Sequence, residues 1–146
     1  MIKTVYPYLS FVDEGQAAIK FYEIALEAKV INIKTFGDMP PNPERPLPEE
    51  IKDRILNAHL KIGNTNLMIS DSFPGSDNAP TKGNSQISIV LITNDPEKTE
   101  EVFNRLKENG TVTMPLQKTF WSPAYGHVTD KFGVTWQIST ELDEEN

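Results

Sequence analysis

The two histidines are the side chains best suited to acid–base chemistry near neutral pH. His59 and His127 are the only imidazoles among 146 residues, and cysteine is absent. The absence of cysteine excludes a thiolate nucleophile, a disulfide and a Cys-ligated zinc. A catalytic imidazole needs a partner that sets its tautomer, and no carboxylate lies at an obvious spacing from either histidine. The sequence therefore favours two polar residues packed or solvated at a sheet face, with a general base or a metal pair including Asn57 as the alternative.

A second candidate for ligand contact is the aromatic segment around Trp121. Phe120, Trp121 and Tyr125 lie close together in a stretch that also contains Pro123. Aromatic side chains on a loop are typical of a lid over a ligand or of a subunit contact. A local hydrophobic cluster that holds the loop in place explains the same residues equally well.

Composition and charge limit the classes of partner. Hydrophobic residues make up 38% and charged residues 24% of the chain, as in globular proteins, and the length corresponds to one domain. The net charge of −7 argues against nucleic acid and against anionic membrane surfaces as partners. No apolar run approaches the length of a membrane span, so we expect a cytoplasmic protein. Residues 141–146 are expected to form a solvated acidic tail.

Hydrophobic periodicity predicts the elements that position these residues. In the first expected module, residues 1–84, strands are predicted at 4–11, 30–35, 55–62 and 65–70. Asp13 and Gln16 form a capping-box pattern ahead of a helix with one apolar stripe. Loops rich in proline, glycine and serine are expected at 37–54, with a short helical turn at 49–52, and at 71–84.

The same order of elements is expected again in the second module, residues 85–140. Its strands are predicted at 86–92, 111–118, 125–129 and 135–139. A helix is expected to start at Asp95-Pro96 and to end before Gly110. An internal repeat of a whole unit is a strong indication of fold. We predict a single α+β domain, in which two tandem βαβββ modules form a curved, partly closed eight-stranded sheet with helices on the outside.

Several segments resemble the PhnB-like branch of the vicinal oxygen chelate (glyoxalase/bleomycin-resistance/dioxygenase) superfamily. The similar segments are PYLSF at 7–11, AIKFY at 18–22, LMISD at 67–71, GTVTMPL at 110–116, TFW at 119–121 and HVTDKFGVTW at 127–136. The resemblance spans nearly the whole chain, and it implies a small-molecule site in a cleft between the modules and a homodimer. Some relatives carry a ubiquinone methyltransferase label, but no Gly-rich nucleotide loop follows the first strand here.

The resemblance also indicates where a metal would be bound. In metal-using members of this superfamily, four ligands come from the first and fourth strands of each module. These positions correspond here to Tyr6 (or its neighbour Pro7), Met68, Ser88 and Gln137. Zinc and other divalent transition metals prefer imidazole and carboxylate ligands, which none of these residues supplies. We therefore expect no metal and no other cofactor.

Strand alternation assigns the side chains expected to face the cleft. The inward-facing set is polar and aromatic and comprises Tyr6, Tyr8, Ser10, Asn57, His59, Met68, Ser70, Gln86, Ser88, Gln137 and Ser139. From it we predict a ligand-binding group made of Tyr6, Tyr8, His59, Met68, Ser88 and Gln137, with Trp121 at the mouth. The alternative is a wet, partly collapsed barrel interior without a ligand.

The function that the sequence favours is metal-free binding of a small molecule in this cleft. The sequence assigns no catalytic residue, and it leaves open which ligand is bound and whether modules pair within a chain or swap between chains. One alternative is a superfamily enzyme, such as a lyase, isomerase or ring-cleaving dioxygenase, with an altered metal or acid–base set. Another is sequestration of a cationic drug by an acidic groove at a dimer interface.

Overall fold

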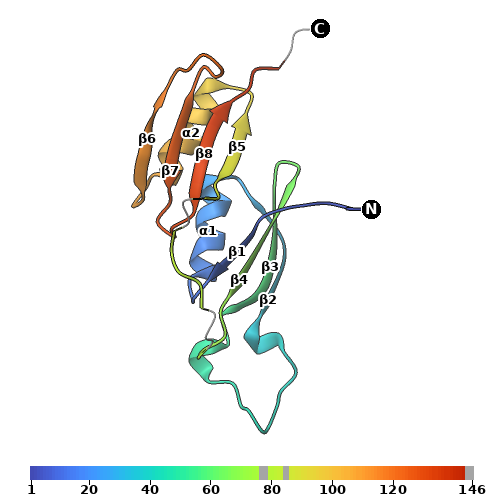
Figure 1. Ribbon diagram of the computed structural model, residues 1–146. Coiled ribbons are helices and arrows are strands. Elements are labelled where there is room, and N and C mark those ends of the chain that lie inside the picture. Colours follow the sequence, from blue (N-terminus) through green and yellow to red (C-terminus); the bar gives the residue numbers. More distant parts are fainter. Residues whose placement is uncertain (76–78, 84–85, 144–146) are drawn as a thin grey trace. The chain divides into compact units, whose positions relative to one another are not determined.

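The computed structural model describes residues 1–75, 79–83 and 86–143 of the chain. These residues divide into two compact units, Met1–Thr81 and Lys82–Asn146 (Figure 1). The sequence placed the boundary between modules a few residues later, after residue 84. Each unit is described by itself below, and the expectation of a single domain stays a prediction.

The first unit contains one βαβββ module. Its elements are β1 (Tyr8–Phe11), α1 (Gly15–Ala25), β2 (Lys29–Thr35), the short 3-10 helices η1 (Phe36–Asp38) and η2 (Glu49–Ile51), β3 (Ile55–Ile62) and β4 (Thr65–Asp71). The four strands form one sheet in the order β1-β4-β3-β2. β1 runs parallel to β4, and the other neighbouring strands are antiparallel. The predicted β2, β3 and β4 are confirmed to within one residue at each end.

The second unit repeats this arrangement. Its elements are β5 (Ile89–Thr93), α2 (Pro96–Leu106), β6 (Thr111–Gln117), β7 (Tyr125–Thr129) and β8 (Thr135–Thr140). The sheet order β5-β8-β7-β6 and the strand directions match those of the first unit. The predicted α+β fold with tandem βαβββ modules is confirmed. Hydrogen bonds join the eight described strands in two sheets of four, one in each module.

The first strand of each module starts later than the sequence predicts. β1 begins at Tyr8 rather than Thr4, because proline has no N–H group to donate across a sheet. Pro7 takes part only through its carbonyl, which accepts from the backbone N–H of Met68 at 3.1 Å. β5 likewise begins at Ile89 rather than Gln86. Tyr6 and Ser88 therefore lie just ahead of these strands and not within them.

Each helix covers one face of its own sheet, and the apolar core of the module lies between them (Figure 1). In the first module, the buried side chains of this layer include Ala18, Ile19 and Tyr22 from α1 and Ala58, Leu60, Leu67 and Ile69 from the sheet. In the second module they include Val102, Phe103 and Leu106 from α2 and Val128, Trp136 and Ile138 from the sheet. Since side chains alternate along a strand, the intervening residues point to the opposite, open face.

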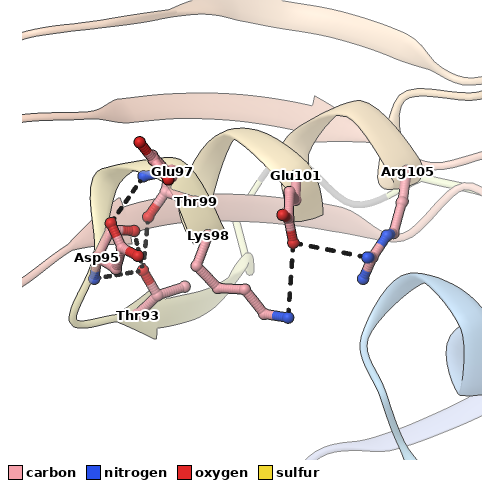
Figure 2. Close-up of polar contacts among 7 residues, drawn as sticks. All are labelled: Thr93, Asp95, Glu97, Lys98, Thr99, Glu101 and Arg105. Carbon is pink, nitrogen blue, oxygen red and sulfur yellow. Dashed lines mark hydrogen bonds and ion pairs between the residues drawn. The ribbon is translucent and has the colours of Figure 1, made fainter.

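The start of α2 follows the sequence prediction. The Asp95 carboxylate accepts from the backbone N–H of Glu97 at 3.0 Å and caps the helix (Figure 2). The Thr93 hydroxyl lies 2.7 Å from that of Thr99 in the first turn of the helix. Further along, Arg105 forms an ion pair with Glu101 four residues earlier, with 3.6 Å between nitrogen and oxygen. Local sequence signals therefore define this helix.

The start of α1 differs from the prediction. Asp13 does not cap this helix: the N-cap position is Glu14, and its side chain makes no capping hydrogen bond. The carboxylate that approaches the helix start belongs to Asp71, at the end of β4. It accepts from the backbone N–H groups of Gly15 at 2.8 Å and Ile55 at 2.7 Å. A Cβ atom on residue 15 would lie 2.8 Å from this carboxylate, so the close approach requires glycine.

Candidate functional site

The open face of the second module's sheet is fixed by the residues that point toward α2. On β7, a Cβ atom added to Gly126 would lie 2.7 Å from the ring of Phe103 in α2, so this position faces the helix. Its neighbours Tyr125 and His127 must therefore face the other way. On β8, Ile138 is buried on the helix side, and Gln137 faces the open side with the pair from β7. This agrees with the face that alternation assigned to Gln137.

Four side chains on this open face form a continuous chain of hydrogen bonds. The phenol oxygen of Tyr125 lies 2.8 Å from Nε2 of His127 and 2.5 Å from Oε1 of Gln137. The amide nitrogen of Gln137 then donates to the Ser88 hydroxyl at 2.8 Å. All four residues are half-buried. Three neighbouring segments, β7, β8 and the approach to β5, therefore contribute to one polar cluster, which we call the module-two site.

Aromatic rings extend the module-two site into the loop between β6 and β7. The ring of Trp121 lies edge-on to Tyr125 with 5.3 Å between centroids, and the ring of Phe120 lies edge-on to Trp121 at 4.8 Å. Trp121 is 55% exposed and Phe120 98% exposed, so both present apolar surface to solvent. Trp121 therefore lies next to the module-two site through its contact with Tyr125, and its predicted place at the mouth of a ligand site stays a prediction.

Ser122 anchors this aromatic loop to the sheet. The buried Ser122 hydroxyl accepts from the backbone N–H of Thr140 at 3.1 Å and lies 2.9 Å from the Thr140 carbonyl. The backbone N–H of Ser122 donates to the Thr119 hydroxyl at 3.1 Å. These bonds fix the residue next to Trp121, so the indole is held near the sheet by backbone-anchored contacts.

The open face of the first module carries a less connected group. The amide of Asn57 donates to the Tyr8 hydroxyl at 3.4 Å, and Nε2 of His59 lies 2.8 Å from the amide oxygen of Asn66. Met68 is the strand partner of both Tyr8 and His59. The structure therefore places Tyr8, His59 and Met68 beside one another on this face, and their predicted contact with a ligand stays a prediction. Tyr6 lies before β1 and is 40% exposed.

Strand register gives the residue equivalences between the modules. Tyr8 pairs with Met68 across β1 and β4, and Val90 pairs with Gln137 across β5 and β8. Two residues before Tyr8 and Val90, just ahead of the strands, Tyr6 corresponds to Ser88. The strand register therefore assigns the expected metal position of the first module to Tyr6 and not to its neighbour Pro7.

The ligand-binding group predicted from the sequence did not include Tyr125 and His127, which the structure places in the module-two site. The sequence disfavoured a general-base role for both histidines, because neither has a carboxylate at a suitable spacing, and placed only His59 in the binding group. The structure supplies a phenol to His127 and an amide to His59 as partners instead. The spacing of Tyr125 and His127, two residues apart in a predicted strand, already placed them on one face, and this signal could have identified the pair.

The residues at the four expected metal positions do not fit a divalent metal. Both ends of the Gln137 amide are engaged, the oxygen by Tyr125 and the nitrogen by Ser88. Met68 offers only a thioether, which suits soft metals. Across the described part of the chain, no group of three or more His, Asp or Glu side chains is arranged to hold a metal ion. No helix there is long and apolar enough to cross a membrane.

Comparison with known proteins establishes the family. Residues 5–138 match the family model of the Glyoxalase/Bleomycin resistance protein/Dioxygenase superfamily, and the chain belongs to this superfamily. This confirms the superfamily that the sequence resembles.

Three relatives show how far the similarity extends. Protein YjdN of Escherichia coli is 34% identical over 139 residues, which are 91% of this chain and 92% of that protein. The crystal structure of protein PA1353 from Pseudomonas aeruginosa shares 35% identity with a TM-score of 0.81, covering 97% of this chain and all of that one. A Bacillus cereus PhnB protein described as a putative 3-demethylubiquinone-9 3-methyltransferase has a TM-score of 0.74 at 21% identity, covering 95% of this chain and all of that one. At that identity the likeness to the PhnB protein shows the fold alone.

Proposed function

We propose that this protein binds a small organic molecule at the module-two site without a divalent metal. The observation that carries the proposal is the connected cluster of Ser88, Gln137, Tyr125 and His127, with half-exposed Trp121 beside it. Small-molecule sites combine apolar and aromatic surface with a few placed hydrogen-bonding groups. The cluster has both kinds of group on one face, opposite the helix-covered core.

The proposal includes the corresponding face of the first module. Tyr6, Tyr8, His59 and Met68 are the residues proposed to contact ligand there. Tyr8 is 52% exposed, and among the described residues its phenol has one long hydrogen bond, from Asn57 at 3.4 Å, so it remains accessible. The predicted cleft between the modules stays a prediction.

The indole N–H signal of Trp121 provides the test. Trp121 is half-exposed whereas Trp136, the only other tryptophan, is buried and bonded to Asp130, so the two indole signals report on different environments. We expect small aromatic ketones and amides, added at millimolar concentration to the ¹⁵N-labelled protein, to shift the Trp121 signal and leave that of Trp136 in place.

A matched pair of variants identifies the site. Ser88→Leu fills the module-two site with an apolar side chain and should abolish the shift of Trp121. Thr111→Leu adds the same side chain at an exposed position on β6 and should leave it unchanged. Binding that survives Ser88→Leu, or that moves neither indole signal in the wild type, would contradict the proposal.

A second candidate function is acid–base catalysis, because His127 has the partner that a general base requires. Tyr125 bonds Nε2 of the ring at 2.8 Å and leaves Nδ1 as the nitrogen that could exchange a proton with substrate. Deuterium exchange into the methyl group of acetophenone in D₂O tests this: the base removes a proton from the methyl carbon and returns a deuteron. Catalysis predicts exchange above the buffer rate that His127→Gln abolishes. Exchange at the buffer rate supports binding alone.

A further inference from the structure

The module-two site contains enough hydrogen-bond contacts to determine where each proton lies. Tyr125 has a single hydroxyl proton, which is donated to Oε1 of Gln137. The remaining contact of the same oxygen, to Nε2 of His127, therefore requires the imidazole to be the donor. The Gln137 amide nitrogen donates to Ser88. Each residue in the chain therefore donates its hydrogen bond to the next, in the order His127, Tyr125, Gln137 and Ser88.

The two ends of this chain present different groups to solvent. At one end, the Ser88 oxygen already accepts a bond from Gln137, and its own proton finds no acceptor within the described residues. At the other end, neutral His127 carries its proton on Nε2, which leaves Nδ1 with a lone pair. Ser88 is thus a donor that needs an acceptor.

We propose that this polarised chain makes the module-two site selective for planar molecules that present a carbonyl or carboxylate oxygen to the Ser88 hydroxyl. The inference rests on the proposed binding function and names the ligand chemistry within it. Trp121, edge-on to Tyr125 and half-exposed, supplies the apolar surface for the planar body of the ligand. Tyr125 and His127 act as positioning residues, because they hold the Gln137 amide in the orientation that directs its N–H group at Ser88.

The tautomer of His127 tests the direction of the chain without any ligand. Long-range ¹H–¹⁵N spectra distinguish the Nε2–H from the Nδ1–H tautomer, and the His127→Gln variant assigns the signals, since His59 is the only other histidine. We expect the neutral ring of the wild type to be the Nε2–H tautomer. In Tyr125→Phe, which removes the partner but keeps the ring, we expect a mixture of tautomers. An Nδ1–H tautomer in the wild type means that the chain runs the other way and overturns the inference.

Two probes of similar size and opposite hydrogen-bonding character test the selectivity. Acetophenone offers only an acceptor oxygen, whereas aniline at neutral pH offers N–H donors, and both carry one benzene ring. The Trp121 indole shift gives the dissociation constant of each. We expect acetophenone to bind about tenfold more tightly than aniline, the size of one neutral hydrogen bond. Ser88→Ala should remove this preference while keeping the weak binding of both rings.

Gln137→Glu is the decisive variant, because it makes Ser88 the donor, and no longer the acceptor, of the hydrogen bond between residues 88 and 137. A carboxylate only accepts hydrogen bonds, so Tyr125 can still donate to it, and Ser88 must now donate to it as well. The Ser88 oxygen then offers a lone pair, and we expect the preference to change from acetophenone to aniline. Equal binding of both probes in the wild type and all variants overturns the inference but leaves the proposed function standing. If neither probe shifts Trp121, the proposed function fails and the inference fails with it.

Discussion

Replacing Asp71 should destabilise the protein more than any other substitution of a single polar side chain in the first module. Its carboxylate accepts from the N–H groups of Gly15 and Ile55, which join the start of α1 to the start of β3. The side chain is 6% exposed, so water cannot replace it as the acceptor. Asp71→Asn keeps the shape of the side chain but has a single oxygen, and its NH₂ group must face one of the two N–H donors.

The magnitude follows from the number of donors left without a partner. A buried N–H group that loses its acceptor costs about 1–3 kcal/mol. Asp71→Asn leaves one such group and should lower the free energy of unfolding by about that amount. Asp71→Ala leaves both, for about 2–6 kcal/mol, which is a large part of the 5–15 kcal/mol that typically stabilises a domain. Asp71→Asn is therefore the variant to measure.

Urea denaturation followed by far-UV circular dichroism is the appropriate assay, because both tryptophans lie in the second module and do not report on the first. Asp53→Asn, at an exposed position, is the control and should change stability by less than about 0.5 kcal/mol. If Asp71→Asn is as stable as the control at pH 7, the assignment of Asp71 as the acceptor for both N–H groups is wrong.

The pH dependence of the same pair of proteins provides an independent check. Burial raises the pKa of Asp71 above its usual 3.8, outweighing the opposing effects of the two backbone hydrogen bonds and of the nearby Arg54 charge. A raised pKa means that the folded protein binds this proton more tightly than the unfolded chain. The resulting stability is present below pH 3.8 and is lost as the pH rises through the folded pKa. The stability advantage of the wild type over Asp71→Asn should therefore widen as the pH falls from 7 toward 4, and a gap that narrows would contradict this sign.

Three further predictions concern the sheet faces, metal content and assembly. Ile138→Ala, at a fully buried position, should lower the free energy of unfolding by about 2–4 kcal/mol. Gln137→Leu should preserve the fold and abolish ligand binding. If Gln137→Leu unfolds the protein and Ile138→Ala does not, the assignment of the two sheet faces is reversed. Elemental analysis of the dialysed protein should find well under one equivalent of zinc, nickel, iron or manganese per chain. A retained equivalent would favour the alternative of a metal-dependent enzyme of the superfamily. Light scattering at micromolar concentration should give the mass of a homodimer, in which exposed Phe120 and Trp121 could contribute contacts, and a monomer mass would refute this.

The sequence predicted those elements whose signals are local. Asp95 caps α2 because its carboxylate reaches an N–H group two residues away, and such spacing is visible in any sequence. The start of α1 was mispredicted because its acceptor is Asp71, 56 residues from Gly15. No local pattern distinguishes Asp71 from the loop residues that follow it. Its role arises only when β4 ends beside the helix, which is a consequence of tertiary structure.

The candidate site shows the same limit. Alternation correctly placed Gln137 on the open face, because side-chain direction follows directly from the two-residue period of a strand. It could not show that Ser88 and Gln137 are bonded to each other, since that contact depends on the register between β5 and β8. It also could not show that Tyr125 links Gln137 to His127, because these hydrogen bonds depend on the side-chain rotamers of all three residues.

The repeat itself explains why the two modules share a backbone and differ in chemistry. Backbone hydrogen bonds define the same strand order in both sheets, and they depend little on which side chains are present. The hydrogen-bond chain depends on every member. His127 corresponds to His59 and Gln137 to Met68, by their matching strand pairings.

A thioether donates no hydrogen bond and accepts only weakly, so the first module cannot continue a chain from its histidine across to the first strand. His59 bonds instead to Asn66. The first module has Met68, Asn57 and Tyr6 at the positions of Gln137, Tyr125 and Ser88. These differences separate a connected polar site from a set of isolated contacts. For this reason we assign the ligand's hydrogen-bonding group to the second module, although the fold treats the two modules alike.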